Sequence, residues 1–472
     1  MRELPALAEH RGARYAALVV LYIGQGVPQG LLVVALPAFL AERGVSAAAV
    51  GAYLSAVLLP FALKAVAGPF VDRHTYLPMG RRRPWILACG GSMVAGFVAM
   101  AHVPDPVAHI GWLMAAGVAV NASVALLDAA VDGMAVDLVP HDEQPRANAL
   151  MWGGATIGVA LSAVGSALAL DASGVAGAAV ALAVALGGLL IVPLVLRERP
   201  GERLLPWTAG RASDAARAYQ PRGWRRVGRE LRAGMLHPAS LALMGAAACA
   251  GALDGLVIAF MPIFALPTLG WQDAGYASLV AAGQVAAGLL GMGLGSVLIQ
   301  RVGRVRMLGV LAALVACVLL GMALVPGAWS VRVTLVVFAL GYLSAFVLLT
   351  ISLLATGMSL CNRVVAATQF ALFTAAMNVG RSLGSALVGP LDHVLGPSML
   401  LTVAAGLAGL VLALTLRIRS DQANRPLARP TPPRVARVRE PGGAREADPR
   451  DASRRRRRED AGGAVDARTR VS

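Results

Sequence analysis

Long apolar runs recur along almost the whole chain and decide its class. Each can cross a bilayer as one helix, which needs about 20 apolar residues. Only 14% of the 472 residues are charged, against roughly 25% in soluble proteins. No run alternates with the period of two that a membrane β-barrel needs. The sequence therefore predicts an all-α membrane protein with twelve transmembrane helices, at 15–41, 47–71, 84–103, 108–139, 147–170, 174–196, 238–264, 273–299, 307–325, 331–356, 364–389 and 396–416.

The longest interruption, at 197–237, divides the runs into two predicted six-helix bundles, 15–196 and 238–416. The bundles are weakly similar: "DGMAVDLVPHDEQPRANALMWGGATIG" in the first parallels "TGMSLCNRVVAATQFALFTAAMNVG" in the second. Transporters built from duplicated units show such pseudo-symmetry. Residues 1–14 precede the first run without a cleavage signal, so this run is expected to be a retained helix. The segment 417–472, rich in Arg, Pro and Asp, is predicted to be disordered.

Arginine is distributed unevenly among the connections between runs. One set of connections holds nearly all of it, from Arg73 and Arg81 through the 197–237 loop to Arg363. Because positively charged loops stay in the cytoplasm, this set and both termini are expected to face the cytoplasm of a bacterial inner membrane. Part of the 197–237 loop, "ASDAARAYQPRGWRRVGRELRAG", is expected to form a basic amphipathic helix on the membrane surface.

The net charge of +16 does not indicate a nucleic-acid partner, because the arginines lie between apolar runs and in the C-terminal segment. "GRSLG" fits a hydrolase motif but lies within an apolar run, where it indicates helix packing. No phosphate-binding loop, metal-ligand spacing or paired cysteine motif is present. We therefore expect no enzymatic activity, cofactor or metal, and a monomer that contacts lipid, protons and a small solute.

A charged patch, "GPFVDRHTYLPMGRRRPWIL", interrupts the apolar pattern between the second and third runs. Its pattern of Gly68-x-x-x-Asp72-Arg73 followed by Gly80-Arg81-Arg82, with a longer spacer than usual, resembles the signature loop of the major facilitator superfamily. The resemblance implies two six-helix bundles that alternate access, with a charged gate at the cytoplasmic ends. The expected gate residues are Gly68, Asp72, Arg73, Gly80, Arg81, Arg82, Asp137 and Arg146. The second bundle has Gln300 in place of the aspartate, so an asymmetric gate is expected.

Further stretches, including "YIGQGVPQGLLVVALPAFLAERGVSAAAVG", "LPFALKAVAGPFVDRHTYLPMGRRRPWIL" and "DAAVDGMAVDLVPHDE", resemble the AmpG-type muropeptide permeases. That branch also includes acetyl-CoA transporters and iron-siderophore permeases. The resemblance implies uptake of a peptidoglycan fragment, with a siderophore or another organic anion as the alternative. A non-transporting assembly factor on the same fold is a further alternative. The family often has a lysine before the Gly-Asp of the seventh helix, whereas "ACAGALDG" here offers only Asp254.

Three charged residues within the spans are candidates for proton coupling. Charge inside a membrane helix costs roughly 2.5–3.5 kcal/mol, so it generally faces a cavity or a partner. Asp128 and Asp132 lie four residues apart on one helix face, and Lys64 is expected at a similar depth. The two carboxylates form either a proton-accepting pair or a fixed salt bridge with Lys64. Both hold in turn if protonation breaks the salt bridge.

Polar residues on several spans are expected to line a central substrate cavity. The first span is interrupted by glycines and prolines and presents a polar face, which suits a hydrogen-bonding solute. Arg381 keeps its charge and needs an anion, which is either an acidic group of the cargo or Asp254. The expected cavity residues are Tyr22, Gln25, Gln29, Asn121, Asp254, Gln284, Thr374, Asn378 and Arg381.

Overall fold

The computed structural model describes residues 6–62, 64–221, 223–269 and 273–424, and in these ranges every regular element is helical. Ten helical stretches of this part are long and apolar enough to cross a membrane. One of them, 144–195, holds two of the predicted spans. Each of the twelve predicted spans coincides with helix over most of its described residues, and the all-α prediction is confirmed. Of the segment predicted to be disordered, residues 417–424 are helical, as the end of the last helix, so the prediction is wrong there; the rest, from position 425 onward, lies outside the described residues.

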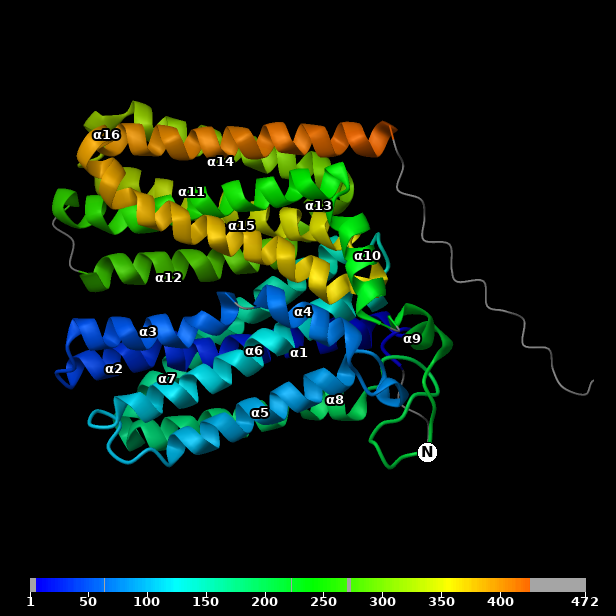
Figure 1. Cartoon of the computed structure of the whole chain (residues 1–472). Coiled ribbons are helices and arrows are strands. Elements are labelled where there is room, and N and C mark those ends of the chain that lie inside the picture. The colour runs from blue at the N-terminus through cyan, green and yellow to red at the C-terminus, as the bar shows by residue number, and fades with distance from the viewer. Residues whose placement is uncertain (1–5, 63, 222, 270–272, 425–472) are drawn as a thin grey trace, which may run out of the picture. The chain divides into compact units, whose positions relative to one another are not determined.

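The first bundle is built from the helices up to α8 (Figure 1). Its first span bends through a π-helical turn, η1, which lies between Pro28 and Pro37. Proline lacks the N–H that an α-helix needs and so permits such an irregular turn. The elements are α1 (Arg11–Gln29), η1 (Gly30–Ala35), α2 (Leu36–Glu42), α3 (Ala47–Ala62), α4 (Lys64–Arg73), η2 (Leu77–Met79), α5 (Arg83–Ala101), α6 (Ile110–Leu138), α7 (Gln144–Leu189) and α8 (Ile191–Val195).

Two short helices in the connecting segment lead to the second bundle, which repeats the pattern of the first. The connecting helices are α9 (Asp214–Tyr219) and α10 (Trp224–Met235). The second bundle comprises α11 (Pro238–Leu269), α12 (Asp273–Leu290), η3 (Gly291–Gly295), α13 (Ser296–Val302), α14 (Arg304–Leu324), η4 (Pro326–Ala328), α15 (Arg332–Leu360), η5 (Arg363–Val365) and α16 (Ala366–Asn424).

The two longest helices, α7 and α16, are each folded back at one glycine. Gly174 has φ 65° and Gly396 has φ 64°, a conformation that favours glycine. Both arms of α7 reach the same part of α1, since Gly26 packs against Ala155 and Gly24 against Leu186. A straight helix could not make both contacts. Each long helix therefore forms two antiparallel spans joined at the glycine.

Close helix packing also repeats between the bundles. A side chain at Gly158 would collide with the backbone carbonyl of Ile23, so α1 and α7 approach closely. In the second bundle, Gly380 and Gly384 of α16 have the same relation to the carbonyls of Ala248 and Ala252 of α11. Small residues permit such packing in membranes. The "GRSLG" sequence is thus a helix–helix contact, as predicted.

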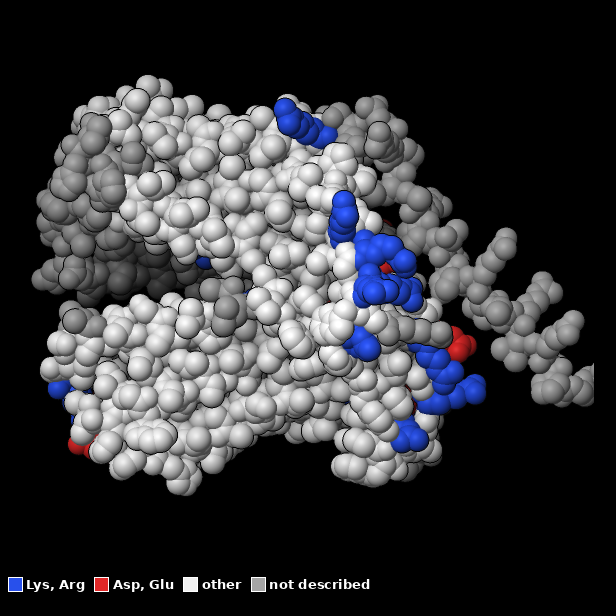
Figure 2. Space-filling view, viewed as in Figure 1, with Lys and Arg blue, Asp and Glu red and all other residues white. Residues whose placement is uncertain are grey.

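The arginine-rich connections gather at one end of the helices, here called the basic end, which carries Arg81, Arg304 and α10. Figure 2 shows the blue Lys and Arg atoms concentrated there. The bundles meet at this end, where Asn148 of α7 donates to the carbonyl oxygen of Ile351 of α15. Toward the opposite end a recess opens between the bundles (Figure 2). Among the described residues, the bundles are therefore in contact at the basic end and separated by this recess toward the other end.

Candidate functional site: a closed gate and two buried charge clusters

The centre of the basic end is a buried network of two arginines and two aspartates. Arg82 donates to Asp72 at 2.6 Å and to Asp137 at 3.1 Å. Arg81 contacts Asp137 at 3.1 Å and Asp72 at 3.5 Å. All four residues are at most 4% exposed. Burying such charges is costly unless each is paired, so the four side chains depend on one another.

The network also joins the first bundle to the second. Asp72 of α4 accepts hydrogen bonds from the Thr368 N–H at 2.8 Å and its hydroxyl at 2.6 Å, at the first turn of α16. A carboxylate at a helix N-terminus is stabilised by unpaired N–H groups and the helix dipole. Arg81 donates to the carbonyl oxygens of Arg363 and Val364, the latter at 2.6 Å. Opening this end requires these bonds to break together.

A second set of bonds crosses between the bundles in the opposite sense. Arg304, at the start of α14, donates to the carbonyl oxygen of His141 at 2.9 Å and to Gln144 at 3.2 Å. Arg81 thus reaches the turn before α16, and Arg304 reaches the turn before α7, its counterpart. Gln300, which replaces the signature aspartate, is exposed. Each bundle therefore supplies one arginine that bonds to the other bundle. The aspartate that caps a helix of the opposite bundle, Asp72, comes from the first bundle, and the exposed Gln300 stands at the corresponding position of the second.

Glu198, which was not among the predicted gate residues, holds the signature loop in shape. Its carboxylate accepts the N–H groups of Arg81 at 2.9 Å and Arg82 at 2.7 Å, and also that of Arg83, at the start of α5. Gly80 (φ 104°) leaves the space that this carboxylate fills. Glu198 is fully buried. An acid among arginines directly after the sixth run was the available signal.

Thr368 and Gly133 were also not predicted as gate residues. Thr368 donates hydrogen bonds to Asp72, and Gly133 leaves space for the Arg82 side chain. A side chain at Gly133 would lie 2.8 Å from the Arg82 guanidinium carbon. Gly68, which was predicted, lies against the backbone of Thr368, where a Cβ would be 2.6 Å from the Thr368 Cα. These contacts depend on which helices pack together, and neither Thr368 nor Gly133 stands out in the sequence.

Two predicted gate residues make contacts outside the network. Arg73 offers its carbonyl oxygen to the side chain of Gln220 at 2.6 Å. The Arg146 guanidinium lies over the Tyr15 ring at 5.5 Å from its centroid. Neither side chain makes a described ion pair with Asp72 or Asp137. Their predicted role in the gate stays a prediction.

Inside the first bundle, Lys64 lies between both candidate carboxylates. Its ammonium contacts Asp132 at 2.9 Å and forms a salt bridge with Asp128. Tyr22 of α1 donates a hydrogen bond to the other oxygen of Asp132. Asp132 is 1% exposed, whereas the Asp128 side chain is 19% exposed. The cluster therefore has one excess carboxylate, with Asp128 as its accessible member.

The second bundle holds a neutral counterpart. Arg381 of α16 contacts Asp254 of α11 at 2.7 Å, and Tyr342 of α15 donates to the same carboxylate at 3.1 Å. Asp254 is 3% exposed, but the Arg381 side chain is 40% exposed. Asp254 is therefore the anion beside Arg381, one of the two predicted possibilities. The exposed part of the Arg381 side chain leaves space for the other predicted possibility, an acidic group of the cargo.

The remaining cavity candidates are in three different situations. Gln29 donates to Asn121 at 2.8 Å, and Asn121 donates to the carbonyl oxygen of Val57, so these side chains tie helices together. The Gln25 amide nitrogen is buried with no hydrogen-bond partner within the described part. The other three candidates make no described side-chain contact with either charge cluster. Thr374 bonds within its own helix, Asn378 is half-buried and Gln284 is exposed.

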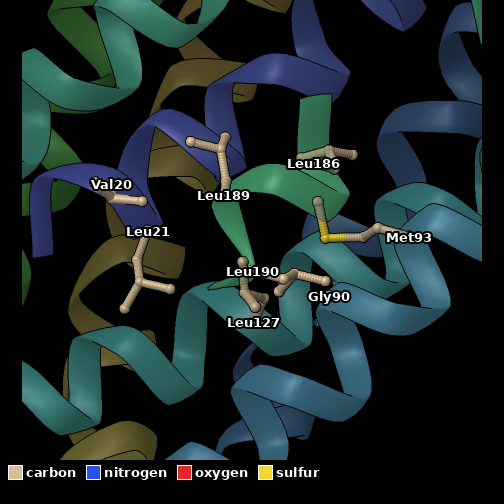
Figure 3. A pocket seen from close by; sticks show the side chains of 9 residues that line it. Val20, Leu21, Gly90, Met93, Leu127, Leu186, Leu189 and Leu190 are labelled. Atoms are coloured by element: carbon tan, nitrogen blue, oxygen red, sulfur yellow. The ribbon is translucent and has the colours of Figure 1, made fainter. Parts of the chain in front are cut away.

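A separate small pocket in the first bundle is wholly apolar (Figure 3). It lies between α1, α5, α6 and the last turns of α7, and its walls offer no hydrogen-bonding side chain. It cannot recognise a polar solute. The pocket is lined by Val20, Leu21, Gly24, Gly90, Met93, Leu127, Leu186, Leu189 and Leu190.

Among the described residues, no group of three or more His, Cys, Asp or Glu is arranged to hold a metal ion.

Comparison with known proteins gives the family. The profile of the Major Facilitator Superfamily matches residues 18–388. The anhydromuropeptide permease of Escherichia coli K12 is 28% identical over 417 residues, covering 86% of this chain and 80% of that protein. The transporter FucP, solved in the outward conformation, superposes with a TM-score of 0.65 at 14% identity over 86% of this chain and 98% of that one. The human organic anion transporter superposes with a TM-score of 0.64 at 14% identity over 85% and 98%. The predicted two-bundle fold is confirmed, and the chain is a multi-pass membrane transporter that belongs to the Major Facilitator Superfamily.

Proposed function

We propose that this protein is a proton-coupled permease that takes up a muropeptide across the inner membrane. The observation that carries the proposal is the similarity to the E. coli anhydromuropeptide permease, which extends over 86% of the chain and both bundles. We further propose that the basic end faces the cytoplasm, because positively charged connections are retained there. The Leu7 N–H donates to the carbonyl oxygen of Arg197 at this end, which supports a cytoplasmic N-terminus, and we propose that the C-terminus lies on the same side.

The recess between the bundles is the proposed route of entry. It opens toward the end opposite the basic end (Figure 2), and in our assignment that opposite end faces the periplasm. Arg381, 40% exposed, is the proposed contact for an acidic group of the cargo. A guanidinium binds a carboxylate or phosphate through a planar fork of donors, and release of Asp254 would free that fork. Tyr22, Gln25 and Gln284 are the proposed hydrogen-bonding neighbours.

The Lys64 cluster is the proposed proton site. One ammonium faces two carboxylates. Binding one proton would neutralise the cluster and weaken one of its salt bridges, which makes protonation a switch for helix movement. Asp128 is the proposed point of proton entry, because Asp132 is shielded from water.

Transport assays in proteoliposomes test the proposal. Purified protein is reconstituted, and uptake of anhydro-muropeptides, ferric siderophores and acyl-CoA esters is measured with and without an inward proton gradient. Gradient-driven accumulation of the muropeptide alone is expected. Asp128→Asn should abolish this accumulation while sparing exchange of cargo. Accumulation of a different class would replace the cargo, and loss of exchange together with accumulation would remove the proton role of Asp128.

A further inference from the structure

Helix α10 runs across the inner ends of the spans rather than along them (Figure 1). At its first residue, the Trp224 ring packs on Phe70, at the end of α4, with ring centroids 5.5 Å apart. At its other end, Leu236 and His237 lead directly into the membrane span α11. Both ends of α10 are thus fixed to the ends of spans. The helix must lie at the level where the membrane meets water.

One face of α10 is already occupied by the protein. Val227 is 4% exposed and packs with Val364 and Val365 of η5. Glu230 accepts a hydrogen bond from Asn362 at 3.0 Å. This face joins α10 to the turn whose carbonyl oxygens receive Arg81. Whatever holds α10 in place therefore also supports the closed gate.

The other face carries arginines at helical spacing around a shallow groove. Arg225, Arg229 and Arg232, at positions i, i+4 and i+7, are all exposed. The groove between them runs over Gly228 and Ala233 and ends at Leu236, which is 57% exposed. The Glu230 carboxylate lies 3.9 Å from the Arg229 guanidinium but accepts a hydrogen bond from Asn362, the residue before η5. The groove thus combines a positive wall with an apolar end.

We propose that this face of α10 binds the headgroup of an anionic phospholipid of the surrounding bilayer. The three arginines match a phosphate diester, and the exposed Leu236 beside the first residues of α11 matches the start of an acyl chain. Basic residues next to a membrane span attract anionic lipid, and each raises the affinity for it by about fivefold. Two exposed tryptophans in this connecting segment, Trp207 at 80% and Trp224 at 49%, are typical of a membrane–water interface.

The position of the groove gives the bound lipid a consequence for the gate. A lipid on α10 would restrain the helix, and the helix contacts η5 through Val227. Because η5 supplies the acceptors for Arg81, restraint of α10 favours the closed basic end. A lipid bound at α10 would act on the gate whatever cargo the protein carries.

Lipid binding by the full-length protein tests the inference. Protein in detergent is titrated with phosphatidylglycerol or phosphatidylcholine, and bound lipid is measured by native mass spectrometry. The test variant carries Arg225→Gln, Arg229→Gln and Arg232→Gln. A matched control loses the same charge at other exposed positions through Arg211→Gln, Arg217→Gln and Arg306→Gln. All proteins keep the arginine-rich C-terminal segment, so its contribution is constant.

Wild type and control should retain phosphatidylglycerol over phosphatidylcholine, and the test variant should lose affinity for phosphatidylglycerol by at least about tenfold. The preference should also weaken at high salt. Equal phosphatidylglycerol binding by the test and control variants would overturn the inference, as would equal binding of the two lipids by wild type. Glycerol phosphate, which has the headgroup without acyl chains, should compete weakly; full competition would assign the groove to a soluble phosphate instead. The test and control variants should have equal thermal stability, which would show that the arginines are not needed for folding. A single Arg229→Lys variant, which keeps the charge, should retain phosphatidylglycerol binding.

Discussion

Asp72 of α4 caps the first turn of α16 by accepting both the N–H and the hydroxyl of Thr368, at 2.8 Å and 2.6 Å. The two residues are 296 positions apart and belong to different bundles. The same carboxylate is bound by Arg82 at 2.6 Å. A single side chain therefore links the charge network of one bundle to the helix start of the other.

Neutralising this carboxylate should open the basic end. Asp72→Asn keeps the shape of the side chain but leaves Arg81 and Arg82 with one carboxylate between them, and removing one partner of a buried pair costs about 3–5 kcal/mol. Electron–electron distance measurements between spin labels at the exposed positions Asp142 and Arg306, in a cysteine-free background, should show a longer-distance population. Glu42→Gln, at the opposite end, is the control and should leave the distances unchanged. Unchanged distances in Asp72→Asn would remove this residue from the gate.

Glu202 should make the stability of the connecting segment depend on pH. Burial, followed by the charge of Glu198, raises the pKa of Glu202 from 4.5 to about 7. The folded protein then binds a proton more tightly than the unfolded chain, so stability falls as the pH rises from about 4.5 to about 7. At 1.36 kcal/mol per pKa unit the effect is at most roughly 3 kcal/mol.

The variant Glu202→Gln resembles the protonated side chain and separates this effect from others. Its melting temperature in detergent should equal that of wild type near pH 5 and exceed it near pH 8. Replacement of the exposed Glu42 by Gln should change neither value. A wild-type melting temperature that rises over this range, with no gain in the variant, would contradict the assignment.

The sequence was sufficient for the fold because hydrophobic length and arginine placement are local signals. It also located Lys64, Asp128 and Asp132, since charge within an apolar run is rare and can be seen without a structure. It could not identify Glu198 or Thr368 as parts of the gate. Their roles arise from contacts with residues more than 100 positions away, Arg81 and Asp72. Nothing in an ordinary Thr indicates such a partner, and the position of Glu198 between two arginines signals a charge contact without identifying the partner.

The Lys64 cluster predicts an unequal response to loss of its members. Lys64→Met should strongly lower the melting temperature, because two carboxylates are left inside the bundle without a cation, at a cost of about 3–5 kcal/mol. Asp128→Asn should be tolerated, since Lys64 keeps Asp132 at 2.9 Å. The double variant Lys64→Met with Asp132→Asn should recover part of the lost stability, which a double-mutant cycle measures. Additive losses would mean that the salt bridge between Lys64 and Asp132 contributes nothing to stability.

The pair in the second bundle predicts a different asymmetry, because its members differ in exposure. Arg381→Gln leaves Asp254, 3% exposed, as an unpaired buried charge and should lower the melting temperature by several degrees. Asp254→Asn leaves Arg381, whose side chain is 40% exposed and reached by water, so the loss should be smaller. Arg381→Lys keeps the charge for Asp254 but removes the planar fork. It should therefore retain stability while raising the KM for an acidic cargo at least about tenfold, if the cargo contacts this side chain as proposed. Arg381→Lys with wild-type KM for every acidic solute transported would assign Arg381 to structure alone and place the cargo's acidic group elsewhere in the recess.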